Sequence, residues 1–281
     1  MDARWIETLA TKPEIIWPVA ATFLPAANLE RARAAAREGR AAILELAGRD
    51  SVAAAVTVAR VGSYDYLLPT FAYTGTEYGP ADAPLRTAAA IAARLRDQGA
   101  APELGPLVPL GAPAFWRQLN GRYAAALAGR FGFHSPCLAC HLYFHALRIP
   151  LARALGCRTV VSGEREDHAG NVKINQTAAL LDLFAAFMKE FDLDLAQPVR
   201  RVRDDREIAA LAGNAAPEAD LECAFAGNYR DAAGSPLLPD PANVARFFEE
   251  FALPYARRVV AAWLAGEKVD YAAAAKDLWK A

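Results

Sequence analysis

The strongest constraint on the fold is a repeated change from short apolar segments to longer helix-like segments along the chain. Residues 41–46 (AAILEL) have the length and composition of a buried strand, and the turn AGRDS joins them directly to the helix-like SVAAAVTVAR. The next strand candidate, YLLPTFAY at residues 66–73, contains Pro69, which weakens the prediction because proline cannot donate to a sheet. Two more strand candidates follow, near residues 107–110 and at residues 157–163 (CRTVVSG).

Helix-like segments separate these strand candidates. Strands that alternate with helices in this way predict an α/β fold, with a doubly wound, mostly parallel sheet that is covered on both faces. We expect residues 39–213 to form this domain, residues 1–38 to pack on it as an N-terminal extension, and residues 214–281 to form a loop and a helical C-terminal region. The helices expected before residue 214 are residues 26–38, 51–60, 85–98, 113–129, 137–156 with Pro150 inside, and 177–191.

Three polar segments follow strand candidates directly. They are residues 47–51 (AGRDS), residues 74–79 (TGTEYG) and residues 162–168 (SGEREDH). Because ligands of doubly wound sheets bind outside the carboxyl ends of the strands, we expect these segments to converge on one site.

The composition limits the classes of function. Hydrophobic residues make up 54% of the 281-residue chain and charged residues 22%, with a net charge of −1 and a pI near 6.4. A large nucleic acid is not the expected partner, since proteins that bind many phosphates usually carry a basic surface. One basic run, residues 200–206, is interrupted by Asp204 and Asp205 and is interpreted as a solvated surface. The apolar runs are too short or too interrupted to span a bilayer, and the N-terminus lacks the pattern of a secretory signal, so we expect a cytoplasmic protein with no membrane segment.

The AGRDS turn lies where a strand passes into a helix. Backbone N–H groups and a helix N-terminus would face an anion there, and Gly48 would let the backbone approach a phosphate closely. Ser51 can cap the helix or donate to a phosphate oxygen, and Asp50 suits a bound metal ion or hydroxyl. The alternative is a strand-to-helix turn without a ligand, capped by Asp50 or Ser51.

Cysteines and histidines gather in SPCLACHLYFH, residues 135–145. Cys137 and Cys140 are one helical turn apart, and Cys223 is a candidate third ligand. Iron–sulfur ligation is one interpretation, and zinc with His141 or Cys223 as the third ligand is another. The remaining alternatives are free catalytic thiols, as a persulfide carrier or a reversible disulfide, and two thiols buried without a function.

Other polar residues near these motifs are candidates for the same site. His141 and His145 have the i, i+4 spacing that lets two imidazoles share an ion, and the alternative is a pair of hydrogen-bonded structural groups. Cys157 precedes a buried strand and is interpreted as a small core residue. The loop at residues 162–176 is dense in polar side chains, which indicates a functional loop, with a solvated connection as the alternative. Its polar side chains include Glu164, Arg165, Glu166, Asp167, His168, Lys173, Asn175 and Gln176.

The strand and turn at residues 41–56 resemble those of the PP-loop ATP pyrophosphatases, a family of Rossmann-like α/β proteins. The family motif, SGGxDS, lies between the first strand and the first helix. Gly48, Asp50 and Ser51 match its second glycine, its aspartate and its final serine. Leu46 and Ala47 stand where the family has its first serine and first glycine, which removes one hydroxyl and some backbone freedom.

A second part of the chain resembles the sulfur-transferring members of that family, such as the tRNA thiolation enzymes. In those members, a CxxC motif opens a helix and is followed by a strand that ends in glycine and an acidic loop. Here the corresponding parts are Cys137, Cys140 and VVSGERED. The resemblance covers roughly residues 41–227.

The resemblance implies a reaction in which ATP is cleaved to AMP and pyrophosphate while a substrate oxygen is adenylated, after which a sulfur nucleophile displaces AMP. It implies ATP and Mg²⁺ as cofactors, and a [4Fe–4S] cluster with one iron that has no protein ligand. Zn²⁺, with His141 as an alternative ligand, remains the other metal. The residues implied for nucleotide binding are Ala47, Gly48, Arg49, Asp50, Ser51, Gly163 and Lys173. Those implied for the metal are Cys137, Cys140 and Cys223, and those implied for catalysis are Asp50, Cys137, Cys140 and Asp167.

The near-neutral charge favours a small molecule or a nucleobase over tRNA as the sulfur acceptor, with sulfide or a persulfide as the donor. A homodimer is left open. Two other functions remain as alternatives: an ATP-dependent amidating or nitrile-forming ligase of the same fold with a structural zinc, and a nucleotide-binding protein without catalysis.

Overall fold

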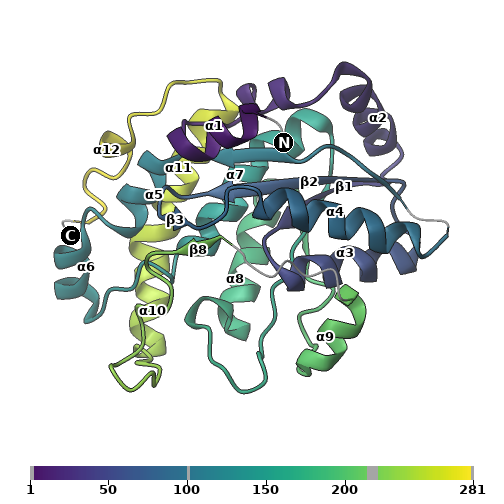
Figure 1. The fold of residues 1–281 in the computed structure, drawn as a ribbon. Coiled ribbons are helices and arrows are strands. Elements are labelled where there is room, and N and C mark those ends of the chain that lie inside the picture. The colour runs from purple at the N-terminus through teal and green to yellow at the C-terminus, as the bar shows by residue number, and fades with distance from the viewer. Residues whose placement is uncertain (1–2, 100–101, 214–220, 280–281) are drawn as a thin grey trace.

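A parallel sheet lies at the centre of the structure (Figure 1). The computed structural model describes residues 3–99, 102–213 and 221–279. The strands of this sheet are β1 (Ala41–Leu46), β2 (Tyr66–Tyr73), β4 (Glu103–Leu104), β5 (Val108–Gly111), β6 (Thr159–Val161) and β7 (Asp194–Ala196). Their order is β4-β2-β1-β6-β7, with β5 also paired to β2, and every pairing is parallel. The predicted α/β fold with a mostly parallel sheet is therefore confirmed.

The strand order reverses between β1 and β6. The chain passes from β1 to β2 on one side, whereas β6 lies on the other side of β1. The carboxyl ends of β1 and β6 therefore flank the switch point, where ligands of doubly wound sheets bind.

Helices cover both faces of the sheet (Figure 1). They are α2 (Ala26–Arg37), α3 (Arg49–Val61), α4 (Ala83–Arg96), α7 (Cys140–Leu155), α8 (Ala178–Lys189) and α9 (Asp205–Ala212). Helix α3 packs against α4 and α9, while α7 packs against α2 and α8. The remaining helical segments are α1 (Ala3–Thr11), η1 (Val19–Phe23), α5 (Pro113–Asn120), α6 (Ala124–Phe131), η2 (Ile174–Gln176), α10 (Pro241–Phe247), the π-helical η4 (Phe248–Ala252), α11 (Leu253–Leu264) and α12 (Tyr271–Ala274).

Pro69 lies inside β2, opposite Leu44 of β1. Backbone polar groups alternate between the two sides of a strand, and the carbonyl of Leu67 accepts from Gly105 on the side away from β1, so Pro69 faces that side too. There β4 ends opposite Leu67, and β5 begins opposite Thr70. The missing N–H of Pro69 falls in the gap between these two short strands, which explains how a buried strand accepts proline.

Two helix predictions need correction. The helix expected at residues 113–129 is divided into α5 and α6, because the chain turns at Gly121. The helix expected from Cys137 begins at Cys140 instead, because residues 136–139 form tight turns in which the Cys140 N–H donates to the Cys137 carbonyl at 3.3 Å. Cys137 therefore lies in a turn before α7 rather than on the helix.

Several elements were not predicted from the sequence. They include β7 and α9, and a two-stranded antiparallel pair of β3 (Glu77–Tyr78) with β8 (Glu222–Cys223). The loop predicted from Asn214 begins in residues 214–220, which lie outside the described part of the chain. Beyond it, α11 packs on α7, and its buried side chains belong to the same hydrophobic core as those of β1 and β2. None of the helices in the described residues is long and apolar enough to span a membrane.

Candidate functional site

Two adjoining cavities lie at the carboxyl ends of the strands, beside the switch point. The larger has a volume of about 800 Å³ and is lined by the turn after β1 and the loop after β6. The smaller has a volume of about 330 Å³ and includes Thr74 and Glu77, which follow β2. The three polar segments thus come together as expected, in cavities of the size that binds small molecules. The residues that line both cavities and form their common wall are Glu45, Ala47, Gly48, His141, Phe144, Asn175, Leu221 and Cys223.

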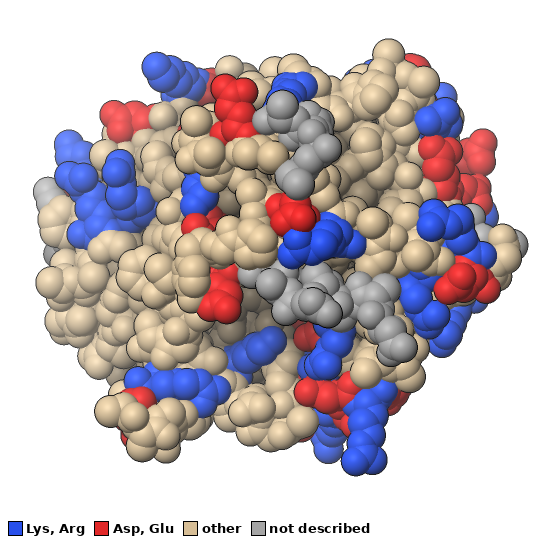
Figure 2. All heavy atoms as spheres, in the orientation of Figure 1, with Lys and Arg blue, Asp and Glu red and all other residues tan. Residues whose placement is uncertain are grey.

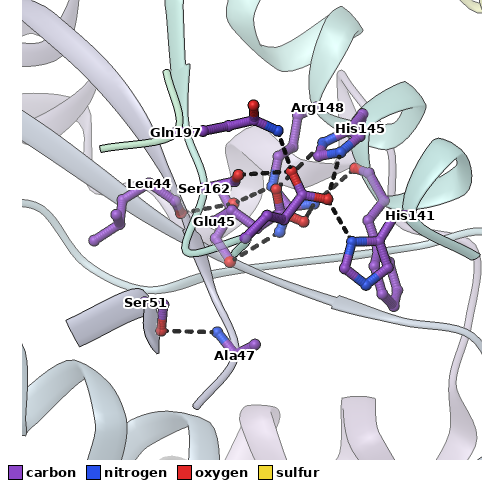
Figure 3. A network of polar contacts seen from close by, with 12 residues as sticks. Leu44, Glu45, Ala47, Ser51, His141, His145, Arg148, Ser162 and Gln197 are labelled. Atoms are coloured by element: carbon purple, nitrogen blue, oxygen red, sulfur yellow. Dashed lines mark hydrogen bonds and ion pairs between the residues drawn. The ribbon is translucent and has the colours of Figure 1, made fainter. Parts of the chain in front are cut away.

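The AGRDS turn closes on its own serine. Ser51 Oγ donates to the Gly48 carbonyl at 2.6 Å and accepts from the Ala47 N–H at 3.1 Å, a contact drawn in Figure 3. Gly48 is the N-cap of α3, and all five residues of the turn line the larger cavity. The backbone of the turn therefore faces the cavity at a helix N-terminus, as an anion site requires, while the Ser51 hydroxyl is engaged within the turn.

Paired charges line the larger cavity. Asp50 Oδ2 lies 3.3 Å from Arg165 Nε and 3.8 Å from His168 Nδ1. The Arg165 contact is an ion pair without hydrogen-bond geometry, because Nε of this buried side chain has no hydrogen-bond partner. Asp205 from α9 bridges Arg165, at 2.8 Å, and Arg49, at 3.4 Å. Helix α9 therefore helps to hold the cationic side chains beside the turn.

Lys173 is different, because its ammonium makes no hydrogen bond or ion pair with any residue that the structure describes. It lines the larger cavity and is only partly exposed. Burial lowers the pKa of Lys173, and the charge of Asp50 only partly opposes this shift. A partly buried cation without a partner is costly unless a ligand supplies the opposite charge, so Lys173 marks a place for an anion.

Asp167 is not brought to either cavity. Its Oδ1 accepts from the Gly170 N–H at 3.0 Å and so closes a turn of the loop. His168 does line the larger cavity, where its Nε2 lies 2.9 Å from Gln176 Oε1, and burial lowers its pKa. Of these two aspartates, the structure therefore places only Asp50 at the larger cavity.

Three cysteines from distant parts of the chain line the smaller cavity. Cys137 lies in the turn before α7, Cys140 is the first residue of α7, and β8 brings in Cys223 by pairing it with Glu77 of β3. All three are free thiols, and burial raises the pKa of Cys137 and Cys140. Cys157 lies apart from them in the hydrophobic core, as expected.

Each of these three sulfurs has a hydrogen-bonding neighbour. Trp116 Nε1 donates to Cys140 Sγ and Asn228 Nδ2 donates to Cys137 Sγ, both at 3.3 Å. Thr76 Oγ1 lies 3.1 Å from Cys223 Sγ. Donors of this kind stabilise metal-bound thiolates, and the sequence alone gave no reason to select Trp116, Asn228 or Thr76.

The spacing of the thiols distinguishes between metals. Two sulfurs bound to one zinc ion at about 2.3 Å can be no more than about 4.6 Å apart. Among the described residues, the only set of three potential ligands whose atoms all lie within 4.8 Å of one another is His141, His145 and Glu164. The three cysteine sulfurs do not form such a set, so at least one pair of them is more than 4.8 Å apart, and in this arrangement they do not close around a single zinc ion.

A buried network of charged side chains lies behind the common wall (Figure 3). Glu164 Oε1 lies 2.5 Å from His141 Nδ1 and 3.2 Å from His145 Nε2. On the other side of its ring, His145 Nδ1 is 3.3 Å from Glu45 Oε2, and Glu45 Oε1 is 3.1 Å from Arg148 Nη1. The exposed fraction is 0% for His145, 1% for Arg148, 4% for Glu164 and 8% for Glu45.

The charges in this network shift one another's pKa. Burial disfavours the imidazolium form of His145, but Glu164 and Glu45 outweigh burial and raise its pKa to about 9. Burial alone would raise the pKa of both carboxyl groups, but Arg148 and His145 lower that of Glu45, and the two histidines hold that of Glu164 well below its usual range. Glu45 and Arg148 were missed by the sequence analysis, although each is a charged residue between apolar neighbours in a strand or helix, which is the signal that could have identified them.

The surface around the site carries both signs of charge. On the face shown in Figure 2, Lys and Arg side chains are interspersed with Asp and Glu and form no continuous basic surface. This distribution agrees with the net charge of −1 and gives no electrostatic footprint for a long nucleic acid on that face.

We compared the sequence with those of known proteins and found a relative. No protein-family profile matches the sequence. The chain is 35% identical over 215 residues to "Uncharacterized protein MJ0009" of Methanocaldococcus jannaschii, an alignment that covers 76% of this chain and 77% of the relative. The chain therefore belongs to the same protein family as MJ0009 of Methanocaldococcus jannaschii.

Proposed function

We propose that this chain is a cytoplasmic PP-loop ATP pyrophosphatase that uses ATP to activate a substrate oxygen and replaces that oxygen with sulfur. The observation that carries the proposal is the common wall of the two cavities. An anion site at the switch point adjoins a cavity lined by three cysteines, so a nucleotide and a sulfur carrier would meet across one substrate.

The larger cavity suits ATP. Its triphosphate would lie against the backbone of the turn at the N-terminus of α3, where Gly48 permits close approach and Lys173 supplies an unpaired positive charge. Asp50 is available to hold Mg²⁺ together with phosphate oxygens, once its contact with Arg165 is exchanged for the metal. Ser51 would keep the turn closed rather than bind phosphate. Backbone N–H groups would then make the phosphate contact that the missing first serine of the family motif would have made.

The smaller cavity suits an iron–sulfur cluster. Cys137, Cys140 and Cys223 would supply three thiolates, each with a hydrogen-bonding neighbour, and at least one pair of these sulfurs is farther apart than one zinc ion can bridge. These three cysteines would hold a [4Fe–4S] cluster with one iron free of protein ligands, and such a cluster would supply the chemistry of a sulfur carrier. The side chains of Phe71 and Phe144 line the same cavity and would exclude water from the reacting carbon.

The proposed reaction has two displacements. In the first, the substrate oxygen attacks the α-phosphorus of ATP, a new P–O bond forms, and pyrophosphate leaves. In the second, a sulfur nucleophile attacks the activated carbon, a C–S bond forms, and AMP departs with the original oxygen. The protein would lower the barrier to both by holding the phosphates and the acceptor in contact and by balancing the phosphate charge with Lys173 and Arg49.

The acceptor that fits best is a small molecule or a free nucleobase. The cavity beside the thiols, at about 330 Å³, has room for a single small ring system, and its lining is mainly apolar. The interspersed surface charges and the net charge of −1 offer little attraction for tRNA. The sulfur donor in this proposal is sulfide, or a protein persulfide whose S–S bond is cleaved after the C–S bond has formed, when a second thiol attacks it and forms a disulfide as the thio product leaves.

The metal content is the first test. Purification without oxygen, followed by absorbance spectroscopy and assays of iron, sulfide and zinc, should give a brown protein with about four irons and four sulfides per chain, as [4Fe–4S] requires. Cys137→Ser, Cys140→Ser and Cys223→Ser should each lose iron, whereas Cys157→Ala should retain it. A colourless protein without iron would reject the cluster, and zinc that is lost when the three cysteines are replaced would favour the amidating or nitrile-forming ligase.

Pyrophosphate release is the second test. The wild-type chain should release pyrophosphate from ATP in the presence of a suitable nucleobase or small-molecule acceptor, and Asp50→Ala should release far less. Equal release from both proteins would remove the role assigned to Asp50. ATP binding without any release, across a broad acceptor panel, would favour a nucleotide-binding protein without catalysis.

A further inference from the structure

We propose that His141, His145 and Glu164 bind one divalent transition-metal ion, with Zn²⁺ as the ion that suits them best. The two histidines are i and i+4 on α7, and Glu164 reaches them from the loop after β6. One potential ligand atom from each lies within 4.8 Å of the other two. The inference uses neither the thiols nor sulfur transfer, so it stands or falls independently of the proposed function.

The groups behind the ligands are arranged as at known metal centres. A metal-bound imidazole generally donates its other ring N–H to a carboxylate, and bound carboxylates accept hydrogen bonds in turn. His145 presents Nε2 to Glu164 and Nδ1 to Glu45 Oε2 at 3.3 Å, while Arg148 holds the other oxygen of Glu45. Glu164 Oε2 accepts from Ser162 Oγ at 2.9 Å and from Gln197 Nε2 at 2.8 Å, which leaves Oε1 facing the two histidines.

A bound metal ion would also account for the buried polar atoms of this group that are not well paired by hydrogen bonds. His145 is fully buried, and its Nδ1 and the Glu45 Oε2 beside it both lack a hydrogen bond. One oxygen of Glu164 faces two imidazole nitrogens. With a metal at Nε2, His145 would be neutral and carry its proton on Nδ1, where Glu45 can accept it after a small adjustment.

The donor set and its surroundings indicate which ion and what role. Two imidazoles and one carboxylate suit Zn²⁺ or Fe²⁺ and not Mg²⁺ or Ca²⁺, which prefer oxygen ligands throughout. Glu45 and Glu164 carry two negative charges and Arg148 one positive charge, so the pocket attracts a cation when the histidines are neutral. His141 lines both cavities, and Glu164 lines the larger. Three protein ligands with an open side toward a cleft are typical of a catalytic rather than a structural zinc.

The test must exclude binding by the thiols. We would use the full chain with Cys137→Ser, Cys140→Ser and Cys223→Ser together, free of metal, and titrate it with Zn²⁺ by calorimetry and by equilibrium dialysis. One Zn²⁺ per chain is expected. Adding His141→Ala or Glu164→Gln should abolish stoichiometric binding, and Glu45→Gln should weaken it by roughly 10- to 100-fold.

Glu166→Gln is the matched control. Glu166 follows Glu164 in the same loop but pairs with Arg200 at 2.6 Å and lines neither cavity, so its replacement should leave Zn²⁺ binding unchanged. Absence of one-to-one binding in the triple cysteine variant, or binding that survives His141→Ala, would overturn the proposal. If the triple variant does not fold, X-ray absorption at the zinc edge of the wild-type chain decides the matter: a nitrogen and oxygen shell supports the site, and a sulfur shell alone rejects it.

Discussion

Gly163 lies so close to Asp50 that a Cβ atom on the glycine would be 2.6 Å from the carbonyl carbon of Asp50 and 2.6 Å from the backbone nitrogen of Ser51. The loop after β6 can therefore reach the N-terminus of α3 only with glycine at this position. The contact joins the segments that follow the two strands flanking the switch point, and Gly163, Asp50 and Ser51 all line the larger cavity.

Replacing this glycine tests whether the contact shapes the site. We expect Gly163→Ala to lower the free energy of unfolding by about 1–3 kcal/mol, because the added methyl group overlaps backbone that cannot move freely. ATP affinity should fall by more than tenfold, since the loop is pushed away from the turn. Urea unfolding and calorimetric titration with ATP measure the two effects. Gly129→Ala is the control: a Cβ at this helical glycine meets no atom within 4 Å, so alanine should raise stability by up to about 1 kcal/mol and leave ATP binding unchanged.

Replacing Lys173 should weaken ATP binding but stabilise the ligand-free protein. The pKa of Lys173 is lowered in the folded chain, so below its ordinary pKa the charge opposes folding. Lys173→Met should therefore raise the free energy of unfolding of the ligand-free protein at pH 7 and weaken ATP binding by about tenfold or more. Lys189→Met changes an exposed lysine paired with Asp194 and should do neither. If Lys173→Met destabilised the protein and bound ATP normally, Lys173 would have a structural role instead.

Trp116 should tune the cluster if one is bound. Trp116→Phe keeps the aromatic ring and removes the N–H that donates to Cys140 Sγ. A donor to a thiolate stabilises the more negative, reduced state of a cluster, so its loss should lower the reduction potential while iron content is retained. Trp263→Phe removes an N–H that donates to the Tyr271 hydroxyl and should leave the potential unchanged. Voltammetry or a redox titration followed by electron paramagnetic resonance supplies the measurement, and equal potentials in the two variants would contradict the assignment.

Arg148 should be costly to remove alone. Arg148→Met removes one of the two positive neighbours of the buried Glu45 and leaves His145, and breaking a buried ion pair in this way typically costs about 3–5 kcal/mol. Adding Glu45→Gln removes the buried negative charge, so the double variant should recover part of the lost free energy of unfolding. Arg153→Met is the comparison, because Arg153 and Asp192 form an exposed pair worth no more than about 1 kcal/mol. Urea unfolding of the wild type, Arg148→Met, Glu45→Gln and the double variant gives the coupling energy between Arg148 and Glu45, and a value near zero would show that the two charges act separately.

The sequence predicted those parts of the fold that depend on local composition. The strands at residues 41–46 and 66–73 have the predicted bounds, because each is a continuous apolar segment between turns. Helix α9 was missed although Asp204, followed three residues later by Glu207, is a helix-start signal, and Asp204 Oδ1 does accept from the Arg206 N–H. The surrounding arginines were interpreted as a solvated charged surface instead.

The candidate site was predicted less completely than the fold, for a physical reason. Gly48, Asp50 and Lys173 follow strands in the sequence, and the topology of a parallel sheet brings such residues together. Glu45 and Arg148 lie inside an apolar strand and an apolar helix, and their pairing depends on how α7 crosses the sheet. Whether Cys223 joins Cys137 depends on a strand pair only two residues long, which no local pattern specifies.

The proline in β2 has a consequence for assembly. Pro69 lies between the positions where β4 and β5 pair with β2, so one edge of the sheet consists of two short strands, of two and four residues. The opposite edge is β7, which is three residues long. Short edges give the strand of another molecule little backbone to pair with. In the part of the chain that the structure describes, we therefore expect any self-association to use surfaces other than the edges of the central sheet.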